Sequence, residues 1–582
     1  MSSTNDAAAP RYGSDLIVEL LHEAGLTRVS FNPGSTIRGL HESLVHAGRS
    51  DELVLCLSEG IAVTVAQGYA KACGRPMAVL LHDIVGLQNA SMAIYNAWCD
   101  RVPMLLLGGT GPLSKARRRP WIDWIHTASA QAELVRPFVK WDDQPHDLES
   151  VPESLARAVT ASVAVPPGPV YWCLDVDLQE QPLGEHQPAG RPLASYPVPT
   201  PPSAHPDDLD EMAGRLRTAR LPLLVTGFAG DTPEGFGLLV ELAELLHAPV
   251  LDAGPRLSFP TTHELWAGAL PELMTEVDLA VLLDCEDPAG ALTTSLPDLP
   301  ADRVVNVTTA HLRLRSWAQD YQRLPAASRH LTADARPVLQ GLLDRLRARP
   351  VEARLRIDRQ SLLADRAREH RRGWREQARQ AERADCVPLE RLLVELDDAL
   401  AGLDIVLAAG TNERLEHRLW SLDRPRQWCG HTGGGGLGYG IAASIGVALA
   451  VPAGTIVVDV QADGDLLFAP QALWTASRLH LPLLIVVNNN RCYGNTARHA
   501  RHIAHDRRRS AGLEYAGSGL DDPVVDLAGL ARSFGVAAWG PIRDADQLPG
   551  VLAEAVATVR AGTPALIDVV MPGGPGTDQE EP

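Results

Sequence analysis

A strand, a helix and a second strand follow one another closely in the C-terminal part of the chain. The strand pattern Thr455–Val460 leads into an Asp-Gly turn at 462–465, and the helical stretch Pro470–His480 comes next. A second apolar run, Leu483–Val487, ends in three asparagines at 488–490. The two strands of such a unit are parallel and their connection is right-handed. The pattern therefore predicts an α/β domain in which both polar segments lie at the same edge of one sheet, where such sheets bind ligands.

The same alternation of apolar runs and helix-length stretches occurs twice more, and 582 residues are too many for a single hydrophobic core. A Pro-rich stretch, Gln181–Pro206, is typical of a linker, and the highly charged residues 351–384 indicate a connecting helix. We predict three doubly wound α/β domains, spanning 12–185, 206–345 and 386–573. The strands expected in the first two are Met77–Leu81, Pro103–Leu107, Val170–Leu174, Leu221–Thr226, Pro249–Leu251, Leu279–Leu283 and Arg303–Asn306.

Charge and hydropathy exclude several classes of protein. The net charge of −19 argues against a general nucleic-acid binder, which would need to neutralise phosphates. No apolar run reaches the roughly 18–20 residues of a membrane span, and Met1–Arg11 lacks a signal pattern, so we expect a cytoplasmic protein with no membrane partner. The eight cysteines form no CxxC pair, which indicates neither a zinc site nor a disulfide framework.

The polar residues at the two strand ends suggest a metal site. Asp463 and Asn490 place a carboxylate and an amide oxygen at one edge of the predicted sheet. Mg²⁺ prefers such oxygen ligands and is often shared with a phosphate group. Asp-Gly and Asn-Asn pairs are also common in ordinary turns, which is the alternative interpretation.

An Asp-Gly turn followed by an asparagine pair at this distance resembles the diphosphate-binding signature of thiamine-diphosphate enzymes. The resemblance implies that Asp463, Asn490 and the backbone carbonyl of Cys492 bind Mg²⁺. The first glycine of the signature is replaced by Ala462, which matters only if that residue needs a positive φ or a close backbone approach. The residues implied in cofactor binding here are Gly464, Asp465 and Asn490.

A glycine-rich segment, Thr432–Gly440, contains a formal G-x-G-x-x-G pattern and so raises a dinucleotide site as an alternative. That motif should follow a strand, whereas Arg426–His431 is polar and not strand-like. The segment is similar instead to the cofactor loop of the acetolactate synthase and benzoylformate decarboxylase family. By that resemblance Leu437 props the cofactor into its bent form, and the Gly435 carbonyl accepts a hydrogen bond from its aminopyrimidine. A flexible glycine linker is the other interpretation.

In the N-terminal domain, Leu57–Gly60 is predicted to end a strand and open a helix over Ile61–Lys71. This segment resembles the one that carries the essential glutamate of the family, which implies that Glu59 acts on the cofactor pyrimidine as a catalytic acid–base group. A carboxyl group with a pKa raised by partial burial suits that role. A glutamate that merely stabilises a helix N-terminus is the alternative.

Two further segments are similar to benzoylformate decarboxylase. Asn32–Ser35 resembles a loop whose serine contacts the substrate carboxylate, and Leu81-His82 resembles the strand end that carries an active-site histidine. The resemblance implies that Ser35 binds a carboxylate and that His82 transfers protons. A non-catalytic histidine at a strand end is equally compatible with the sequence. Acetolactate synthases usually carry a glutamine near His126-Thr127, and its absence argues against that reaction.

Together these motifs predict a thiamine-diphosphate- and Mg²⁺-dependent decarboxylase or carboligase, a lyase or transferase acting on a 2-oxo acid. Loss of CO₂ would leave an enamine on the cofactor, which is either protonated or captured by an acceptor. The alternatives are an FAD-containing acetohydroxyacid synthase-type enzyme, a nicotinamide-dependent dehydrogenase and a non-catalytic regulatory relative. Because the family builds its site between subunits, the resemblance also implies a homodimer or homotetramer.

Overall fold

The computed structural model describes residues 11–184, 192–310, 324–363, 366–411, 414–430, 432–509 and 515–573. The chain divides into two compact units. The first contains residues 1–70, 74–200 and 433–436, and the second contains 71–73, 201–432 and 437–582. Each unit is an α/β structure built on parallel sheets, as the sequence predicts.

The first unit contains one six-stranded parallel sheet with the order β2-β1-β3-β4-β6-β5. Its strands are β1 Val29–Phe31, β2 Leu53–Leu55, β3 Ala78–Leu81, β4 Met104–Thr110, β5 Asp142–Asp143 and β6 Pro169–Asp175. Its helices are α1 Gly13–Glu23, α2 Arg38–His46, α3 Glu59–Cys73, α4 Ile84–Cys99, α5 Val151–Val163 and α6 Val176–Gln179.

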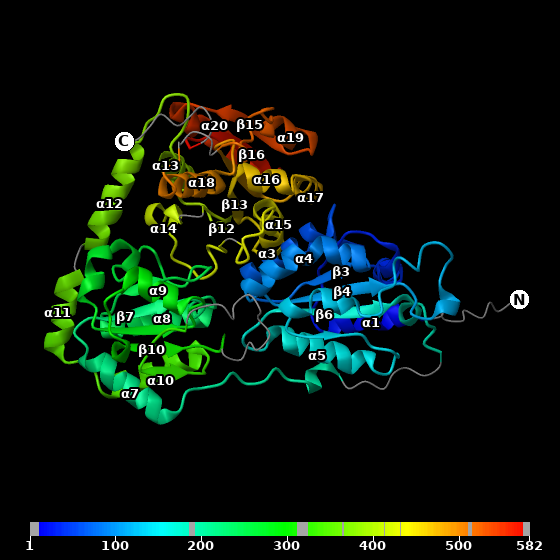
Figure 1. The fold of residues 1–582 in the computed structure, drawn as a ribbon, viewed down its shortest axis with the longest axis horizontal. Coiled ribbons are helices and arrows are strands. Elements are labelled where there is room, and N and C mark those ends of the chain that lie inside the picture. The colour runs from blue at the N-terminus through cyan, green and yellow to red at the C-terminus, as the bar shows by residue number, and fades with distance from the viewer. Residues whose placement is uncertain are drawn as a thin grey trace, which may run out of the picture. The chain divides into compact units, whose positions relative to one another are not determined.

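Helices cover both faces of this sheet. Alternate strand residues, such as Ala78 and Leu80, join a buried cluster with apolar side chains of α1, α2 and α5 on one face. The other face is covered by α3 and α4, so β3, β4 and β6 lie between α4 and α5 (Figure 1). The strands are buried on both faces, which explains why they are continuous apolar runs without alternation.

The second unit contains two five-stranded parallel sheets. The central sheet has the order β11-β10-β9-β7-β8, from β7 Pro222–Thr226, β8 Val250–Asp252, β9 Leu279–Leu283, β10 Val304–Val307 and β11 Arg329–Leu331. The C-terminal sheet has the order β12-β13-β14-β16-β15, from β12 Ile405–Ala409, β13 Ile456–Ala462, β14 Leu483–Asn489, β15 Ala537–Ile542 and β16 Ala565–Val570.

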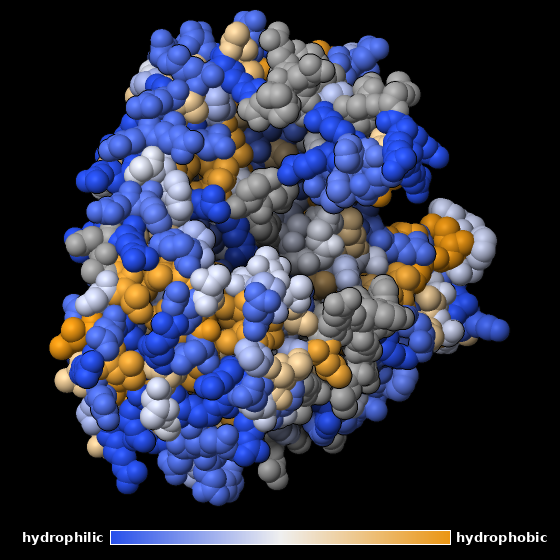
Figure 2. Space-filling model, turned by 60° about the vertical axis from the view of Figure 1, so that its left-hand side comes forward, coloured by the Kyte–Doolittle hydropathy of each residue, from blue (hydrophilic) through white to orange (hydrophobic). Residues whose placement is uncertain are grey.

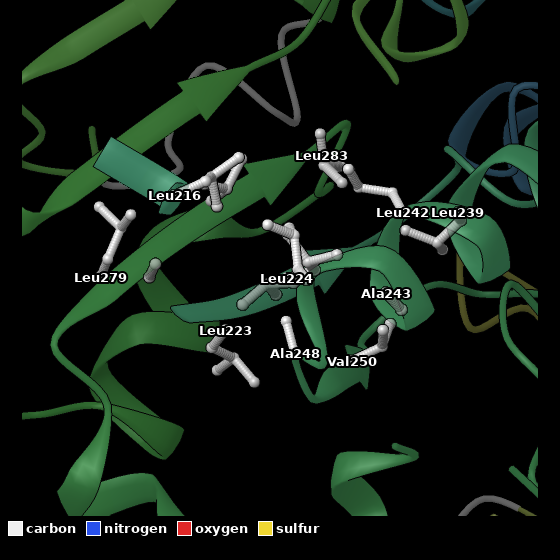
Figure 3. Close-up of a cluster of buried hydrophobic side chains, with 14 of the residues drawn as sticks. Leu216, Leu223, Leu224, Leu239, Leu242, Ala243, Ala248, Val250, Leu279 and Leu283 are labelled. Carbon is white, nitrogen blue, oxygen red and sulfur yellow. The ribbon is translucent and has the colours of Figure 1, made fainter. Parts of the chain in front are cut away.

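The helices of the central region pack their apolar sides on its sheet. In Figure 3, leucines of α7 (Pro206–Thr218) and α8 (Pro233–Leu246) meet leucines of β7 and β9. Among them Leu216, Leu223, Leu224, Leu242 and Leu283 are completely buried. The remaining helices here are α9 Pro288–Ser295 and α10 Ala335–Ala348. The four central strands expected from the sequence are confirmed, and only the short edge strand β11 was not foreseen.

The described residues of the connecting segment are largely helical, as the sequence predicts. On either side of residues 364 and 365 they form α11 (Ala353–Leu363) and α12 (Arg366–Arg379), which follow one another along the second unit (Figure 1). The fully buried Arg359 of α11 donates hydrogen bonds to the carbonyls of Leu216 and Ala219, at the end of α7, and of Leu246, at the end of α8. It thereby satisfies carbonyl groups that the ends of helices leave without an intrahelical partner.

A second arginine acts in the same way. Arg371 of α12 donates to the Thr261 carbonyl in the central region and to the His417 and Trp420 carbonyls, which lie between β12 and β13 of the C-terminal sheet. Burial lowers the pKa of both guanidinium groups to about 10, so they remain charged near neutral pH. The bonds of Arg371 link the central and C-terminal regions within the second unit.

The remaining helices belong to the C-terminal region. They are α13 Leu389–Ala399, α14 Leu415–Leu419, α15 Gly440–Ala450, α16 Asp463–Phe468, α17 Ala472–Arg478, α18 Gly494–Asp506, α19 Leu527–Ser533 and α20 Leu548–Arg560. No helix among the described residues is long and apolar enough to cross a membrane. Hydrophilic residues cover most of the face that Figure 2 shows.

The boundaries of the three expected domains stay a prediction. Each predicted range contains one of the three sheets. Of the expected linker, the described residues on either side of 185–191 form no helix or strand apart from a short 3₁₀ turn, Leu193–Ser195.

Candidate active site

Glu59 is the first residue of α3, in the first unit. The N-cap residue Ser58 accepts a hydrogen bond from the Ile61 N–H, and the Gly60 N–H donates to the Asn89 side chain of α4 at 3.2 Å. These contacts fix the start of the helix and therefore the position of the Glu59 carboxyl group. Burial raises the pKa of Glu59, and the nearby charge of Asp83 raises it further. A carboxyl group in this state exchanges a proton more readily near neutral pH than an exposed one.

His82 follows the last residue of β3, and both of its ring nitrogens lie close to polar groups. Its Nδ1 atom lies 2.9 Å from the Thr36 hydroxyl oxygen, and its Nε2 atom lies 3.3 Å from the Asp83 carboxylate. Burial lowers the pKa of His82 from its usual value, against the opposing influence of the Asp83 charge. The imidazole is therefore neutral near pH 7 and able to accept a proton.

Two glycines bring Glu59, His82 and Ser35 together. A Cβ atom on Gly86, in the first turn of α4, would lie 2.9 Å from the Glu59 Oε1 atom and 3.1 Å from the His82 Cβ atom. A Cβ atom on Gly34, the residue before Ser35, would lie 2.4 Å from the His82 ring. Both positions exclude a side chain, so the three predicted catalytic residues lie around one site. Their roles stay predictions.

The site also contains His126, which sequence reasoning mentioned only as a departure from acetolactate synthases. Its carbonyl accepts the N–H of Gly111, directly after β4, and this anchors the loop that carries the imidazole. The His126 Nδ1 atom lies 3.3 Å from the same Asp83 oxygen that His82 approaches. A histidine so far along the chain carries no local signal that would place it beside His82.

The diphosphate half of the predicted site lies in the second unit. Strands β13 and β14 are parallel neighbours, and they end at Ala462 and Asn489. Asp463 and Asn490 thus follow the carboxyl ends of adjacent strands, as the sequence predicts. The α16 helix begins at Asp463, where the sequence suggested a turn. Ala462 has φ −76°, a conformation open to any residue, so its replacement of glycine causes no strain.

The Asp463 carboxyl group is 2% exposed, and burial raises its pKa to about 7. Its buried Oδ1 atom has no hydrogen-bond partner among the described residues. The Asn490 Oδ1 atom accepts the Cys492 N–H at 3.1 Å, and Gly494 leaves room for the Asn490 amide. A buried carboxylate with a free oxygen beside an amide fits a small divalent cation.

The Asp465 carboxylate holds the glycine loop through backbone hydrogen bonds. It accepts the N–H groups of Gly438 and Gly440, each at 2.8 Å, and that of Tyr439 at 3.3 Å. We therefore expect Asp465 to contribute to cofactor binding indirectly, by fixing the conformation of this loop. In that loop Gly435 has φ +71°, which favours glycine, and Leu437 is 38% exposed.

The dinucleotide alternative for this loop lacks its strand. The described residues just before the loop, 414–430 and 432, contain the short helix α14 and one isolated bridge at Trp428, but no strand. A G-x-G-x-x-G motif depends on a strand that ends at its first glycine. The geometry therefore argues against a nicotinamide site.

Comparison with known proteins decides the family. Residues 11–134 match the family "Thiamine pyrophosphate enzyme, N-terminal TPP binding domain", and residues 408–569 match its "C-terminal TPP binding domain". The chain belongs to the thiamine pyrophosphate enzymes. Both halves of the site described above lie within the matched residues.

Relatives of this thiamine pyrophosphate enzyme extend over almost its whole length. It is 28% identical to "Benzoylformate decarboxylase" of Pseudomonas aeruginosa, over 95% of this chain and 97% of that protein. It is 25% identical to "Acetolactate synthase isozyme 3 large subunit" of Escherichia coli, over 96% and 95%. The structure of the 4-hydroxybenzoylformate decarboxylase of Rhodococcus jostii shares the fold, with a TM-score of 0.75 at 23% identity over 96% and 99%.

Proposed function

We propose that this enzyme decarboxylates a 2-oxo acid with thiamine diphosphate and Mg²⁺, and either releases the product as an aldehyde or transfers it to a carbonyl acceptor. The observation that carries the proposal is the proximity of Glu59 and His82 across Gly86. A carboxyl group with a raised pKa and a neutral imidazole together form an acid–base pair for proton transfers. The similarity to a benzoylformate decarboxylase supports a 2-oxo acid as substrate.

The metal assignment is supported by the donor set in the second unit. Mg²⁺ would be held by the Asp463 carboxylate, the Asn490 amide oxygen and the Cys492 carbonyl, with diphosphate oxygens completing its shell. The free Oδ1 atom of Asp463 is the observation that favours a cation there. Gly464 packs against the Tyr493 ring, since a Cβ atom would lie 2.7 Å from it, and this close contact keeps the turn beside Asp463 compact.

When bound, thiamine diphosphate supplies a carbanion that adds to the ketone carbon and an electron sink for the bond that breaks on loss of CO₂. Glu59 would share a proton with the pyrimidine ring, Leu437 would support the bent cofactor and the Gly435 carbonyl would accept a hydrogen bond from it. Ser35 would bind the substrate carboxylate, and His82 would accept or return the proton that the product requires.

The two halves of the site lie in different units, and we propose that two subunits combine them in a homodimer or a larger homo-oligomer. Large apolar side chains are exposed near each half, an arrangement that supports an interface. In the first unit they are Leu57, Val85 and Met92, and in the second they are Leu437, Phe468 and Tyr493. Analytical ultracentrifugation of the holoenzyme tests this, and a monomer with full activity would contradict it. A cytoplasmic location stays a prediction.

The first experiment is to measure CO₂ release from a panel of 2-oxo acids that includes pyruvate and benzoylformate, with thiamine diphosphate and Mg²⁺ present. Parallel reactions contain aldehyde and 2-oxo acid acceptors, and product mass separates decarboxylation from carboligation. We expect release from at least one donor and a strong decrease in His82→Ala, with His502→Ala on the exposed face of α18 as the control. Tight cofactor binding without release from any donor would contradict the proposed function.

A further inference from the structure

The carboxylate of Asp83 lies between two imidazole rings in the first unit. Its Oδ2 atom is 3.3 Å from the Nε2 atom of His82 and 3.3 Å from the Nδ1 atom of His126. The three donor atoms all lie within 4.8 Å of one another. The Asp83 side chain is completely buried, whereas each histidine side chain is 15% exposed. The cluster is therefore closed on one side and accessible on the other.

Hydrogen bonds do not account for this convergence. Neither the Asp83 Oδ2 atom nor the His126 Nδ1 atom has a hydrogen-bond partner among the described residues, although both atoms are buried. The ring N–H directions therefore miss the carboxylate oxygen despite the short distances. A buried carboxylate oxygen that accepts no hydrogen bond is unfavourable unless a positive charge lies beside it. A cation placed between the three atoms would supply that charge.

The spacing suits a tetrahedral metal ion. Zn²⁺ binds imidazole nitrogen and carboxylate oxygen at about 2.0–2.2 Å, which places two ligand atoms of a tetrahedron about 3.3–3.5 Å apart. Both distances to Asp83 match that value. The two imidazole nitrogens lie within 4.8 Å of each other, so a small movement of the rings on ion binding would complete the spacing. The rings meet edge to face with centroids 5.0 Å apart.

The outer contacts of the cluster resemble those that orient metal ligands. The second ring nitrogen of His82 is held by the Thr36 hydroxyl at 2.9 Å, and the same hydroxyl oxygen accepts the Asp83 N–H at 3.1 Å. The other carboxylate oxygen of Asp83 accepts the Val85 N–H at 2.9 Å. Contacts of this kind fix the ligating atom and its direction before an ion arrives.

We propose that His82, Asp83 and His126 form a site for a divalent transition-metal ion of the Zn²⁺ class, with a fourth coordination position open to water or a substrate carboxylate. Nitrogen ligands distinguish this site from the oxygen site for Mg²⁺ at Asp463. The expected effect rests on the proposed function, in which His82 transfers protons. An ion bound to the His82 imidazole would prevent that transfer. Zn²⁺ is therefore expected to inhibit turnover without displacing the cofactor.

The test uses the holoenzyme with thiamine diphosphate and excess Mg²⁺, so that the oxygen site stays filled. Co²⁺ is titrated as a spectroscopic substitute, because tetrahedral Co²⁺ absorbs visible light strongly, and Zn²⁺ affinity is measured by competition. We expect one Co²⁺ ion per chain with tetrahedral absorbance, and at least a tenfold weaker affinity in His126→Gln and in His82→Gln. The control His502→Gln alters an exposed histidine of α18 and should bind Co²⁺ as the wild type does.

Equal affinity in the wild type and both cluster variants, or the absence of tetrahedral absorbance, would overturn the metal site. Binding of Zn²⁺ with unchanged turnover would overturn the inhibition. Because the absorbance does not require turnover, a failure of the proposed function is distinguishable from a failure of the site. Circular dichroism of the two variants, whose altered side chains are partly exposed, verifies that they fold.

Discussion

Replacing Asp463 by Asn removes a carboxyl group whose pKa burial raises from 3.8 to about 7. In the cofactor-free wild type, folded Asp463 keeps a proton between about pH 4 and pH 7, whereas the unfolded chain loses it there. The wild type is therefore stabilised by this group at low pH and loses that contribution as the pH rises through about 7. The Asn variant does not titrate here, so it should gain stability relative to the wild type as the pH rises.

The magnitude follows from the width of that window. From pH 5 to about pH 7, Asp463 is ionised in the unfolded chain but not in the folded protein. Each of these two pH units corresponds to about 1.36 kcal/mol. The difference in unfolding free energy between variant and wild type should thus grow by about 3 kcal/mol from pH 5 to pH 8. With saturating Mg²⁺ and thiamine diphosphate the wild type should instead be more stable than the variant, because the cation stabilises only the ionised carboxylate of the wild type.

Urea denaturation of both cofactor-free proteins at the two pH values measures this difference, with transitions compared only at equal pH. The exposed Asp298 provides the matched control, since Asp298→Asn should show the same difference from the wild type at both pH values. A difference for Asp463→Asn that does not change between pH 5 and pH 8 would refute the reasoning that burial leaves this carboxyl group without compensation.

Three further predictions concern the catalytic half and the cofactor loop. Glu59→Gln should lower CO₂ release at least about 10²-fold while the cofactor still binds, and near-normal turnover would reject its assigned role. Gly86→Ala places a methyl group 2.9 Å from the Glu59 carboxylate and should lower kcat at least about tenfold. The matched control is Gly237→Ala in α8, where a Cβ atom has no neighbour within 4 Å. Leu437 is 38% exposed, so Leu437→Ala should change the unfolding free energy by less than about 0.5 kcal/mol. The same variant should weaken cofactor binding or turnover, which titration and steady-state kinetics measure.

The strand–helix–strand pattern predicted the core of the second unit because strands buried on both faces must be continuous apolar runs. It also placed Asp463 and Asn490 correctly at adjacent strand ends, since two strands joined by a crossover helix run parallel and end at the same edge of the sheet. The helix that starts at Asp463 was not predictable, because Asp-Gly is equally compatible with a turn.

The cluster of His82, Asp83 and His126 shows a different limit. His82 and Asp83 are neighbours in sequence, and a resemblance singled out His82. His126 reaches them through a loop without hydrophobic periodicity, anchored by a backbone hydrogen bond to Gly111. Such a contact depends on the path of the chain between β4 and β5, which no residue pattern within the loop encodes.

The buried arginines of the connecting segment determine what kind of joint it is. A tether of polar residues would allow the central and C-terminal sheets to move independently, whereas Arg359 binds the segment to the central region and Arg371 binds it to both regions. The segment therefore restricts the relative movement of the two sheets and does not act as a hinge. The central region contributes none of the predicted catalytic residues, yet Arg371 bonds both to it and to the C-terminal region that carries the predicted diphosphate site.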